Sequence, residues 1–183
     1  MFFIRLLKEF YSSLKHPTGR FNYLQGFLRN IPGQIGMTLR NEILVKYFAS
    51  CGEGVSIQEG VRFLNIHKIE LGNRVIIGNG SFLQGGGKII IGNDVLLGPD
   101  VKIWSVNHKF ENINKPILEQ GWEYKKVTIM DGCWLAANVF VLPGVTLPEG
   151  CVVTACSLVS KKNYPPYSIL AGNPCRVIGK RKN

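Results

Sequence analysis

The most regular feature of this chain is an aliphatic residue that returns every six positions, with two interruptions. From Leu71 onward the sequence divides into blocks of six that each begin with leucine, isoleucine or valine. The leading residues are Leu71, Ile77, Leu83, Ile91, Leu97, Ile103, Ile129, Leu135, Val141, Leu147, Val153 and Val159. A period of six fits neither an amphipathic helix nor a long strand, and it indicates a short strand followed by a turn.

The repeat predicts a triangular coil. Three blocks of six close one coil of eighteen residues, and coils of this kind stack in parallel with each leading aliphatic residue above its equivalent. Glycine, asparagine and aspartate recur between the aliphatic positions, where they tolerate the positive φ angles that corners require. We therefore predict an all-β fold, a parallel β-helix of six-residue repeats, whose stacked coils are called the prism below.

The upstream limit and the interior of the prism can also be predicted. Weaker repeats around Val55, Val61 and Ile69 place its beginning near Cys51. Cys133 and Cys151 occupy the same slot in blocks that lie eighteen residues apart. We expect these two thiols to stack inside the prism as packing residues, because an unpaired cysteine behaves as a small hydrophobe when it is buried.

The larger interruption is a long inserted loop at about residues 104–126, which is polar and charged. Insertions in solenoids form loops, and long loops on rigid scaffolds carry function disproportionately. The loop contains His108, one of only three histidines, the others being His16 and His67. His108 is a candidate general base, and the alternative is a solvated loop histidine. The scattered histidines and the absence of paired cysteines or an HxxxH motif predict no metal site.

The first fifty residues have a different pattern. Apolar residues recur at helical spacing between Phe3 and Leu14 and again between Phe21 and Leu28, and a third helix is expected over residues 37–49 after Pro32-Gly33. We predict an N-terminal helical cap segment over 1–50 and a β-helix domain with a C-terminal tail over 51–183. Residues 1–15 also have the character of a basic amphipathic helix that rests on an anionic membrane surface. The two roles are compatible.

Composition narrows the setting. The 183 residues carry a net charge of +10, which favours phosphates, nucleotides or an acidic membrane as partners, or serves only to keep the protein dispersed. We expect no nucleic-acid partner. Five cysteines without a CxxC pair suit a reduced, cytoplasmic chain. No apolar run approaches the roughly 18 residues of a membrane span, and Arg5 and Lys8 interrupt the apolar start before a signal peptide could form.

Three features together resemble one known family. They are the six-residue repeats, the Asn107-His108 pair in the loop, and the closing run over 134–180 with Pro165-Pro166-Tyr167-Ser168 and Ala171-Gly172-Asn173-Pro174. These features resemble the hexapeptide-repeat acetyltransferases over roughly residues 51–180, and most closely the sugar O-acetyltransferases such as the galactoside, maltose and capsule or O-antigen enzymes. The resemblance implies a left-handed β-helix, a homotrimer, and acetyl-CoA bound in the groove between neighbouring prisms, without a metal.

The resemblance also implies roles for particular residues. His108, with Asn107 beside it, matches the catalytic histidine. Ala137 and Ala155 match positions whose backbone N–H groups contact the cofactor or the developing oxyanion. The residues expected near the coenzyme A phosphates and adenine are Ser160, Lys161, Lys162, Arg176 and Lys180, the last because Gly179 stands where the family often has a second basic residue. Ala136-Ala137 replaces the Gly-Ala or Gly-Ser common in the family, which narrows the acyl pocket.

The predicted function is therefore an acetyl-CoA-dependent O-acetyltransferase acting on a sugar hydroxyl in surface polysaccharide biosynthesis, by direct attack with His108 as general base. Asn79, Ser81 and Gln84 are candidate acceptor contacts on coils near the loop. The acceptor is a sugar, either free or linked to a lipid or nucleotide, and the setting is the cytoplasm or the inner face of the membrane. The alternatives are an N-acetyltransferase of a nucleotide-linked amino sugar, a xenobiotic acetyltransferase, and a non-catalytic trimeric scaffold.

Overall fold

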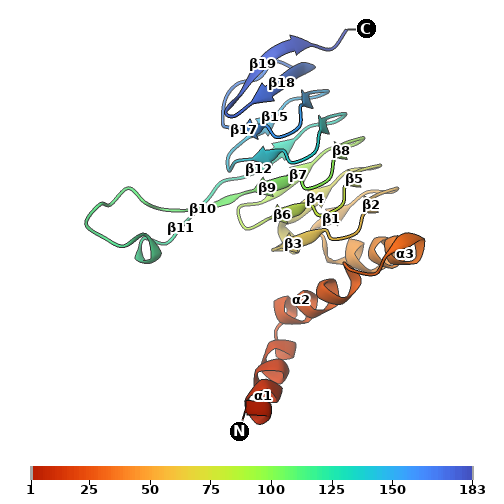
Figure 1. The fold of residues 1–183 in the computed structure, drawn as a ribbon, viewed down its shortest axis with the longest axis vertical. Coiled ribbons are helices and arrows are strands. Elements are labelled where there is room, and N and C mark those ends of the chain that lie inside the picture. The colour runs from red at the N-terminus through yellow and green to blue at the C-terminus, as the bar shows by residue number, and fades with distance from the viewer. Residues whose placement is uncertain (1, 183) are drawn as a thin grey trace.

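The protein is a parallel β-helix with helices at its N-terminal end and an arm that projects from one corner (Figure 1). The computed structural model describes residues 2–182. Met1 and Asn183, the outermost positions of the two predicted units, lie outside the described residues. The predicted class, an all-β parallel β-helix with an N-terminal helical segment and one long insertion, is confirmed.

Three sheets run along the prism and are called sheets A, B and C. Sheet A contains β1 (Ser50–Cys51), β4 (Ile69–Leu71), β7 (Ile89–Ile91), β12 (Val127–Ile129) and β15 (Thr146–Leu147). Sheet B contains β2 (Ser56–Ile57), β5 (Ile76–Ile77), β8 (Leu96–Leu97), β13 (Trp134–Leu135), β16 (Val152–Val153), β18 (Ser168–Gly172) and β19 (Cys175–Lys180). Sheet C contains β3 (Arg62–Leu64), β6 (Phe82–Gln84), β9 (Lys102–Trp104), β14 (Phe140–Val141) and β17 (Leu158–Val159). The chain visits A, B and C in turn, so the corners are named AB, BC and CA.

The predicted repeat is the core of the prism. All twelve leading aliphatic residues are buried, with exposed fractions of 4% or less. Cys133 and Cys151 are buried as well, and burial raises the pKa of the Cys133 thiol to about 12. At neutral pH this thiol is therefore protonated, and both cysteines serve as packing residues, as predicted.

The predicted coil length of eighteen residues holds only toward the C-terminus. Ile129 pairs with Leu147, eighteen positions on, whereas Cys51 pairs with Leu71 and Leu71 with Ile91, twenty positions on. The additional residues lie in the turns of corner CA, where the short 3₁₀ helix η2 (Ile66–Lys68) follows β3. Ile69 and Ile89 are buried beside the leading aliphatics, so the longer turns add core contacts without breaking the stack.

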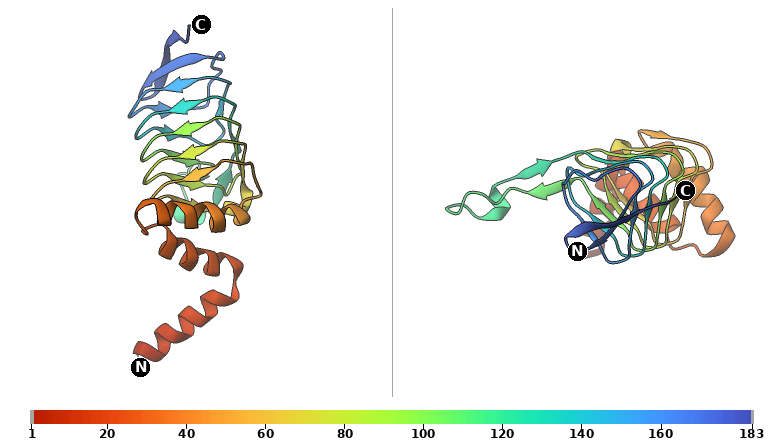
Figure 2. Two further views of the ribbon diagram at one scale, coloured as in Figure 1. Left: turned by 90° about the vertical axis from the view of Figure 1, so that its right-hand side faces the viewer. Right: turned by 90° about the horizontal axis from the view of Figure 1, so that it is seen from above.

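The N-terminal helices differ in how they contact the prism. They are α1 (Phe2–Lys15), α2 (Pro17–Leu28) and α3 (Gly33–Ile43), followed by the 3₁₀ helix η1 (Leu44–Tyr47). The helix expected over 37–49 begins earlier, at Gly33, because Pro32 takes the N-cap position instead of separating two segments. The α-helix also ends earlier, at Ile43. Helix α1 buries none of its described residues and extends away from the coils (Figure 2).

Helices α2 and α3 close the open edge of the first coil through buried polar side chains. Gln25 both donates to the Phe63 carbonyl (3.0 Å) and accepts from the Phe63 N–H (2.9 Å). Arg40, which is 1% exposed, donates to the carbonyls of Ile57, Leu28 and Ile31 at 2.8–3.1 Å. Backbone groups at an edge otherwise need water or another strand. These contacts replace the missing neighbouring coil.

Candidate active site

The insertion between β9 and β12 is an ordered arm. Strands β10 (Val106–His108) and β11 (Trp122–Tyr124) pair in an antiparallel ribbon, with His108 opposite Trp122, and the 3₁₀ helix η3 (Ile117–Glu119) lies toward the tip. Viewed along the prism, the arm extends outward from one corner (Figure 2). The sequence predicted the position of this insertion but not its pairing.

His108 is half-buried near the base of this arm. Its ring stacks on Trp122, with the ring centroids 3.8 Å apart and the planes tilted by 34°. The side-chain oxygen of Asn107 accepts a hydrogen bond from the backbone N–H of His108 at 3.0 Å. Within residues 2–182 no protein group is hydrogen-bonded to either imidazole nitrogen. Stacking therefore orients the ring, and both nitrogens stay available to a substrate.

Ser105 anchors the arm to the prism. The side chain is fully buried, and its hydroxyl donates to the Gln84 carbonyl (2.5 Å) and accepts from the Gly87 N–H (2.9 Å). The Ser105 carbonyl accepts from the N–H of Lys125 at 2.9 Å, so both ends of the arm meet at this residue. The sequence did not predict these roles of Ser105 and Trp122. It showed only that both residues belong to the insertion.

Half of the predicted site residues gather at corner CA. They are Gln84, Asn107, His108, Ser160, Lys161 and Lys162. Lys161 lies next to the returning end of the arm, since a Cβ built on Gly144 would lie 3.4 Å from Lys125 Cδ and 3.6 Å from Lys161 Cδ. The Ser160 hydroxyl is buried without a partner in the described part of the chain. Corner CA thus combines an imidazole with several lysine ammonium groups.

A second group lies at corner BC, across sheet C. It contains Asn79, Ala137, Ala155 and Arg176. The Ala137 carbonyl accepts from the Cys156 N–H at 2.9 Å, and Gly172 N–H donates to Ser157 at 3.0 Å, which brings the β18–β19 hairpin to this corner. Among the described residues, no hydrogen bond uses the backbone N–H of Ala137 or of Ala155. These two amides are therefore free donors on a rigid turn.

Two predicted residues lie elsewhere. Ser81 is fully buried, and its hydroxyl donates to the Gly98 carbonyl at 3.2 Å inside the prism. The fifth position of each block points inward, so this hydroxyl is not accessible to an acceptor and Ser81 is left out of the site proposed below. Lys180 pairs with Ser168, at the opposite end of β19 from Arg176. It lies toward corner AB, away from the other predicted cofactor contacts.

The described part of the chain offers neither a metal-binding cluster nor a membrane-spanning helix. No group of three or more His, Cys, Asp or Glu side chains that could hold a metal ion occurs among residues 2–182. No helix in the same range is long and apolar enough to cross a membrane.

A β-helix of six-residue repeats with a histidine-bearing arm at one corner and free amides at the next defines the class of hexapeptide-repeat acyltransferases. A Staphylococcus aureus (strain MRSA252) protein named as an acetyltransferase, SAR2635, is 32% identical over 146 residues, which is 79% of this chain and 71% of that protein. The chain belongs to the hexapeptide-repeat acetyltransferases, and it is an enzyme of that family. No protein-family model matches the sequence.

Solved structures with the same fold carry related names. A maltose O-acetyltransferase from Clostridium difficile 630 superposes with a TM-score of 0.77 at 28% identity, covering 93% of this chain and 89% of that one. A galactoside acetyltransferase in complex with coenzyme A superposes with a TM-score of 0.79 at 26% identity, covering 89% of this chain and 80% of that one.

Proposed function

We propose that this enzyme transfers the acetyl group of acetyl-CoA to a sugar hydroxyl, with His108 as the general base. The observation that carries the proposal is the His108 imidazole, stacked on Trp122 with both nitrogens free. Coenzyme A in one structural relative and the sugar acceptors named in two of them support the donor and the acceptor class. We further propose that the acceptor is a sugar used in surface polysaccharide biosynthesis.

The chemistry is a direct transfer in a ternary complex. The imidazole takes the hydroxyl proton as the oxygen attacks the thioester carbonyl, which is a task that neutral histidine performs at neutral pH. The backbone N–H of Ala137 donates to the tetrahedral oxyanion, and it needs no reorganisation because the turn is rigid. Collapse of the intermediate breaks the carbon–sulfur bond, and the imidazolium proton passes to the departing thiolate.

The site is completed by assembly. His108 and Ala137 lie at different corners of one prism, so one protomer alone does not hold both. Sheet C, which lies between these two corners, presents an outward row of stacked aromatic side chains, Phe82, Trp104 and Phe140, with neighbouring ring centroids 5.8 and 6.0 Å apart. A homotrimer would cover such a row and place corner CA of one protomer against corner BC of the next. Sedimentation equilibrium tests whether the protein is a trimer, and a monodisperse active monomer would contradict this proposal.

Acetyl-CoA would lie in the groove between two prisms. Ser160, Lys161 and Lys162 on one side and Ala155 and Arg176 on the other supply donors and positive charge for its phosphates. Replacing Lys161 by Gln should weaken acetyl-CoA binding, and an unaltered dissociation constant would remove it from the site. Asn79 and Gln84 are the remaining candidate acceptor contacts.

Helix α1 is proposed to hold the enzyme at the cytoplasmic face of an anionic membrane. Its large apolar side chains are open to solvent, with Phe3 77% and Leu7 67% exposed. Lys8 and Lys15 supply positive charge on its other side, where Arg5 forms an ion pair with Glu9 at 2.8 Å. An exposed apolar row flanked by lysines suits the interface of an acidic bilayer. The wild-type protein should sediment with phosphatidylglycerol vesicles and the Leu7→Glu variant should not. Phe27→Glu on α2, where the side chain is also exposed, is the control and should still sediment.

The first test combines binding and activity. Calorimetric titration with acetyl-CoA should give saturable binding near one per subunit, with trimer content checked on the same sample. Acetylation is then measured on a panel of neutral hexoses, amino sugars and drug hydroxyls. Product on a sugar hydroxyl supports the proposal, product only on an amine or drug replaces it, and no binding to folded protein indicates a non-catalytic scaffold.

A further inference from the structure

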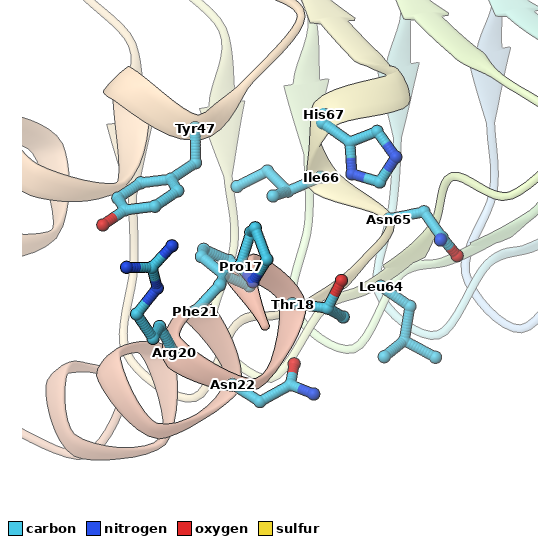
Figure 3. A pocket seen from close by; sticks show the side chains of 10 residues that line it. All are labelled: Pro17, Thr18, Arg20, Phe21, Asn22, Tyr47, Leu64, Asn65, Ile66 and His67. Atoms are coloured by element: carbon cyan, nitrogen blue, oxygen red, sulfur yellow. The ribbon is translucent and has the colours of Figure 1, made fainter. Parts of the chain in front are cut away.

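A cavity lies at corner CA, the same corner of the prism that carries His108. It is a cavity of about 610 Å³ between the start of α2 and the CA corner of the first coil (Figure 3). Its lining residues come from α2, from η1 and from the turn around η2. They are Pro17, Thr18, Arg20, Phe21, Asn22, Tyr47, Leu64, Asn65, Ile66 and His67. None of the sequence motifs and none of the proposed catalytic steps uses this cavity.

The cavity is aligned with the arm through the stacked turns of corner CA. Gly85 N–H donates to the Leu64 carbonyl (2.8 Å), and Ser105 N–H donates to the Gln84 carbonyl (3.2 Å). The turn that lines the cavity is therefore two coils from the turn that carries the arm. Coils in such a stack are about 4.8 Å apart, so the separation along the prism is about 10 Å. A ligand that touches both places must extend beyond a single sugar ring.

The lining favours an anionic group attached to a sugar. Phe21 and Tyr47 offer apolar aromatic surface, and Asn22 and Asn65 offer amide donors and acceptors. Arg20 supplies a positive charge and His67 an imidazole, and no aspartate or glutamate lines the cavity. An arginine fork without a competing carboxylate is suited to a phosphate. The first turn of α2, which begins at Pro17, adds backbone dipoles of the same sign.

We propose that this cavity binds the phosphate group of a glycosyl phosphate acceptor, so that the attached sugar extends along corner CA to His108. This inference rests on the proposed acetyl transfer and names its acceptor class. Two sources share this chemistry, a nucleoside-diphosphate sugar and a lipid-diphosphate sugar. The position of α1 favours the lipid source, because α1 ends at Lys15, next to the cavity, and presents exposed apolar side chains.

Binding is tested first, without acetyl-CoA, so that the result does not depend on turnover. Hexose 1-phosphate is titrated into the full-length protein, and the ring resonances of the three histidines are followed by NMR. The His67 resonances should shift in a saturable way. The Arg20→Gln variant should weaken this binding about tenfold or more, as expected for a lost charge-assisted hydrogen bond. Lys46→Gln removes the same charge from the cap outside the cavity and should have little effect.

Activity then separates the two sources. kcat/KM is compared for a neutral hexose, hexose 1-phosphate, a nucleoside-diphosphate hexose, and a polyprenyl-diphosphate hexose in vesicles. Arg20→Gln should lower kcat/KM about tenfold for the phosphorylated acceptors and leave the neutral hexose unchanged. An equal loss on all acceptors, or unshifted His67 resonances at saturating hexose 1-phosphate, would overturn the cavity proposal. Absence of acetylation on every acceptor would overturn the proposed function while the binding result still decides the cavity.

Discussion

Corners AB and CA of the prism are built from the same repeat, but they use their hydrogen bonds differently. At corner AB, Asn73, Asn93 and Asp131 form a ladder in which each side chain accepts from a backbone N–H one coil away, at 2.8–2.9 Å. At corner CA, the turns are longer, one of them grows into the arm, and the imidazole nitrogens of His108 have no protein partner among the described residues. Stability and chemistry are thus assigned to different edges of one solenoid.

The strongest test of this contrast is His108→Ala. Turnover should fall at least about a hundredfold, or about 2.7 kcal/mol of barrier, because a positioned base contributes that much or more. Acetyl-CoA affinity and melting temperature should be nearly unchanged, since the ring lies on the arm outside the core. Steady-state kinetics, calorimetry and thermal unfolding measure the three quantities. Survival of turnover would place the base elsewhere.

The interior beside corner AB should be sensitive to alkali. Burial raises the pKa of Cys133 to about 12, so the native state keeps this proton at pH values where the unfolded chain loses it. The stabilisation is fully present below about pH 9 and falls by about 1.4 kcal/mol per pH unit as the pH rises toward 12. Urea unfolding from pH 8 to 11 should show a shallower decline in Cys133→Ala. The exposed Cys156→Ala is the control, and identical slopes in all three proteins would refute the assignment.

Ser105→Ala should lower both the free energy of unfolding and kcat. The change leaves the buried Gly87 N–H without its acceptor, which costs about 1–3 kcal/mol. It also loosens the base of the arm, so kcat should fall several-fold while the pH dependence of turnover is retained. The exposed Ser12→Ala on α1 is a matched control. An unchanged unfolding free energy would contradict the anchoring role of Ser105.

The smallest effect is expected at corner AB itself. Asp131→Ala removes the acceptor of two hydrogen bonds from Asn93, at 2.8 and 3.0 Å, on an exposed turn. Stability should fall by about 1 kcal/mol or less, and turnover should be unaltered. A loss of activity comparable with that of His108→Ala would show that the two corners are not separate in function.

The sequence predicted the parts of the fold in which one rule repeats. The leading aliphatics, Cys133 and Cys151 followed from a burial period of six, and burial is what the coil demands at each of those positions. The same rule should have excluded Ser81, since it stands in an inward slot and is buried there. Positive φ angles at Arg74 and Tyr167 were also unforeseen, because the stack imposes the corner on whichever residue occupies it.

Features outside the repeat required tertiary information. The stacking of Trp122 on His108 depends on ribbon pairing across fourteen positions of irregular sequence. The division of the candidate site between corners CA and BC depends on the coil geometry, which a linear match to a family does not display. The cavity beside Arg20 and His67 joins residues from the helical segment and the first coil. Single-sequence patterns do not report such contacts.

The arm also has a consequence for how this enzyme can diversify. Ile91 pairs with Ile129 across 38 positions, whereas Leu71 pairs with Ile91 across 20, so the insertion nearly doubles one coil while the aliphatic stack continues unbroken. Doubling the length of a flexible loop costs only about 0.6 kcal/mol in closure entropy. Insertions and deletions near the tip are therefore almost neutral for folding. The length of the arm can therefore change on a scaffold that stays the same.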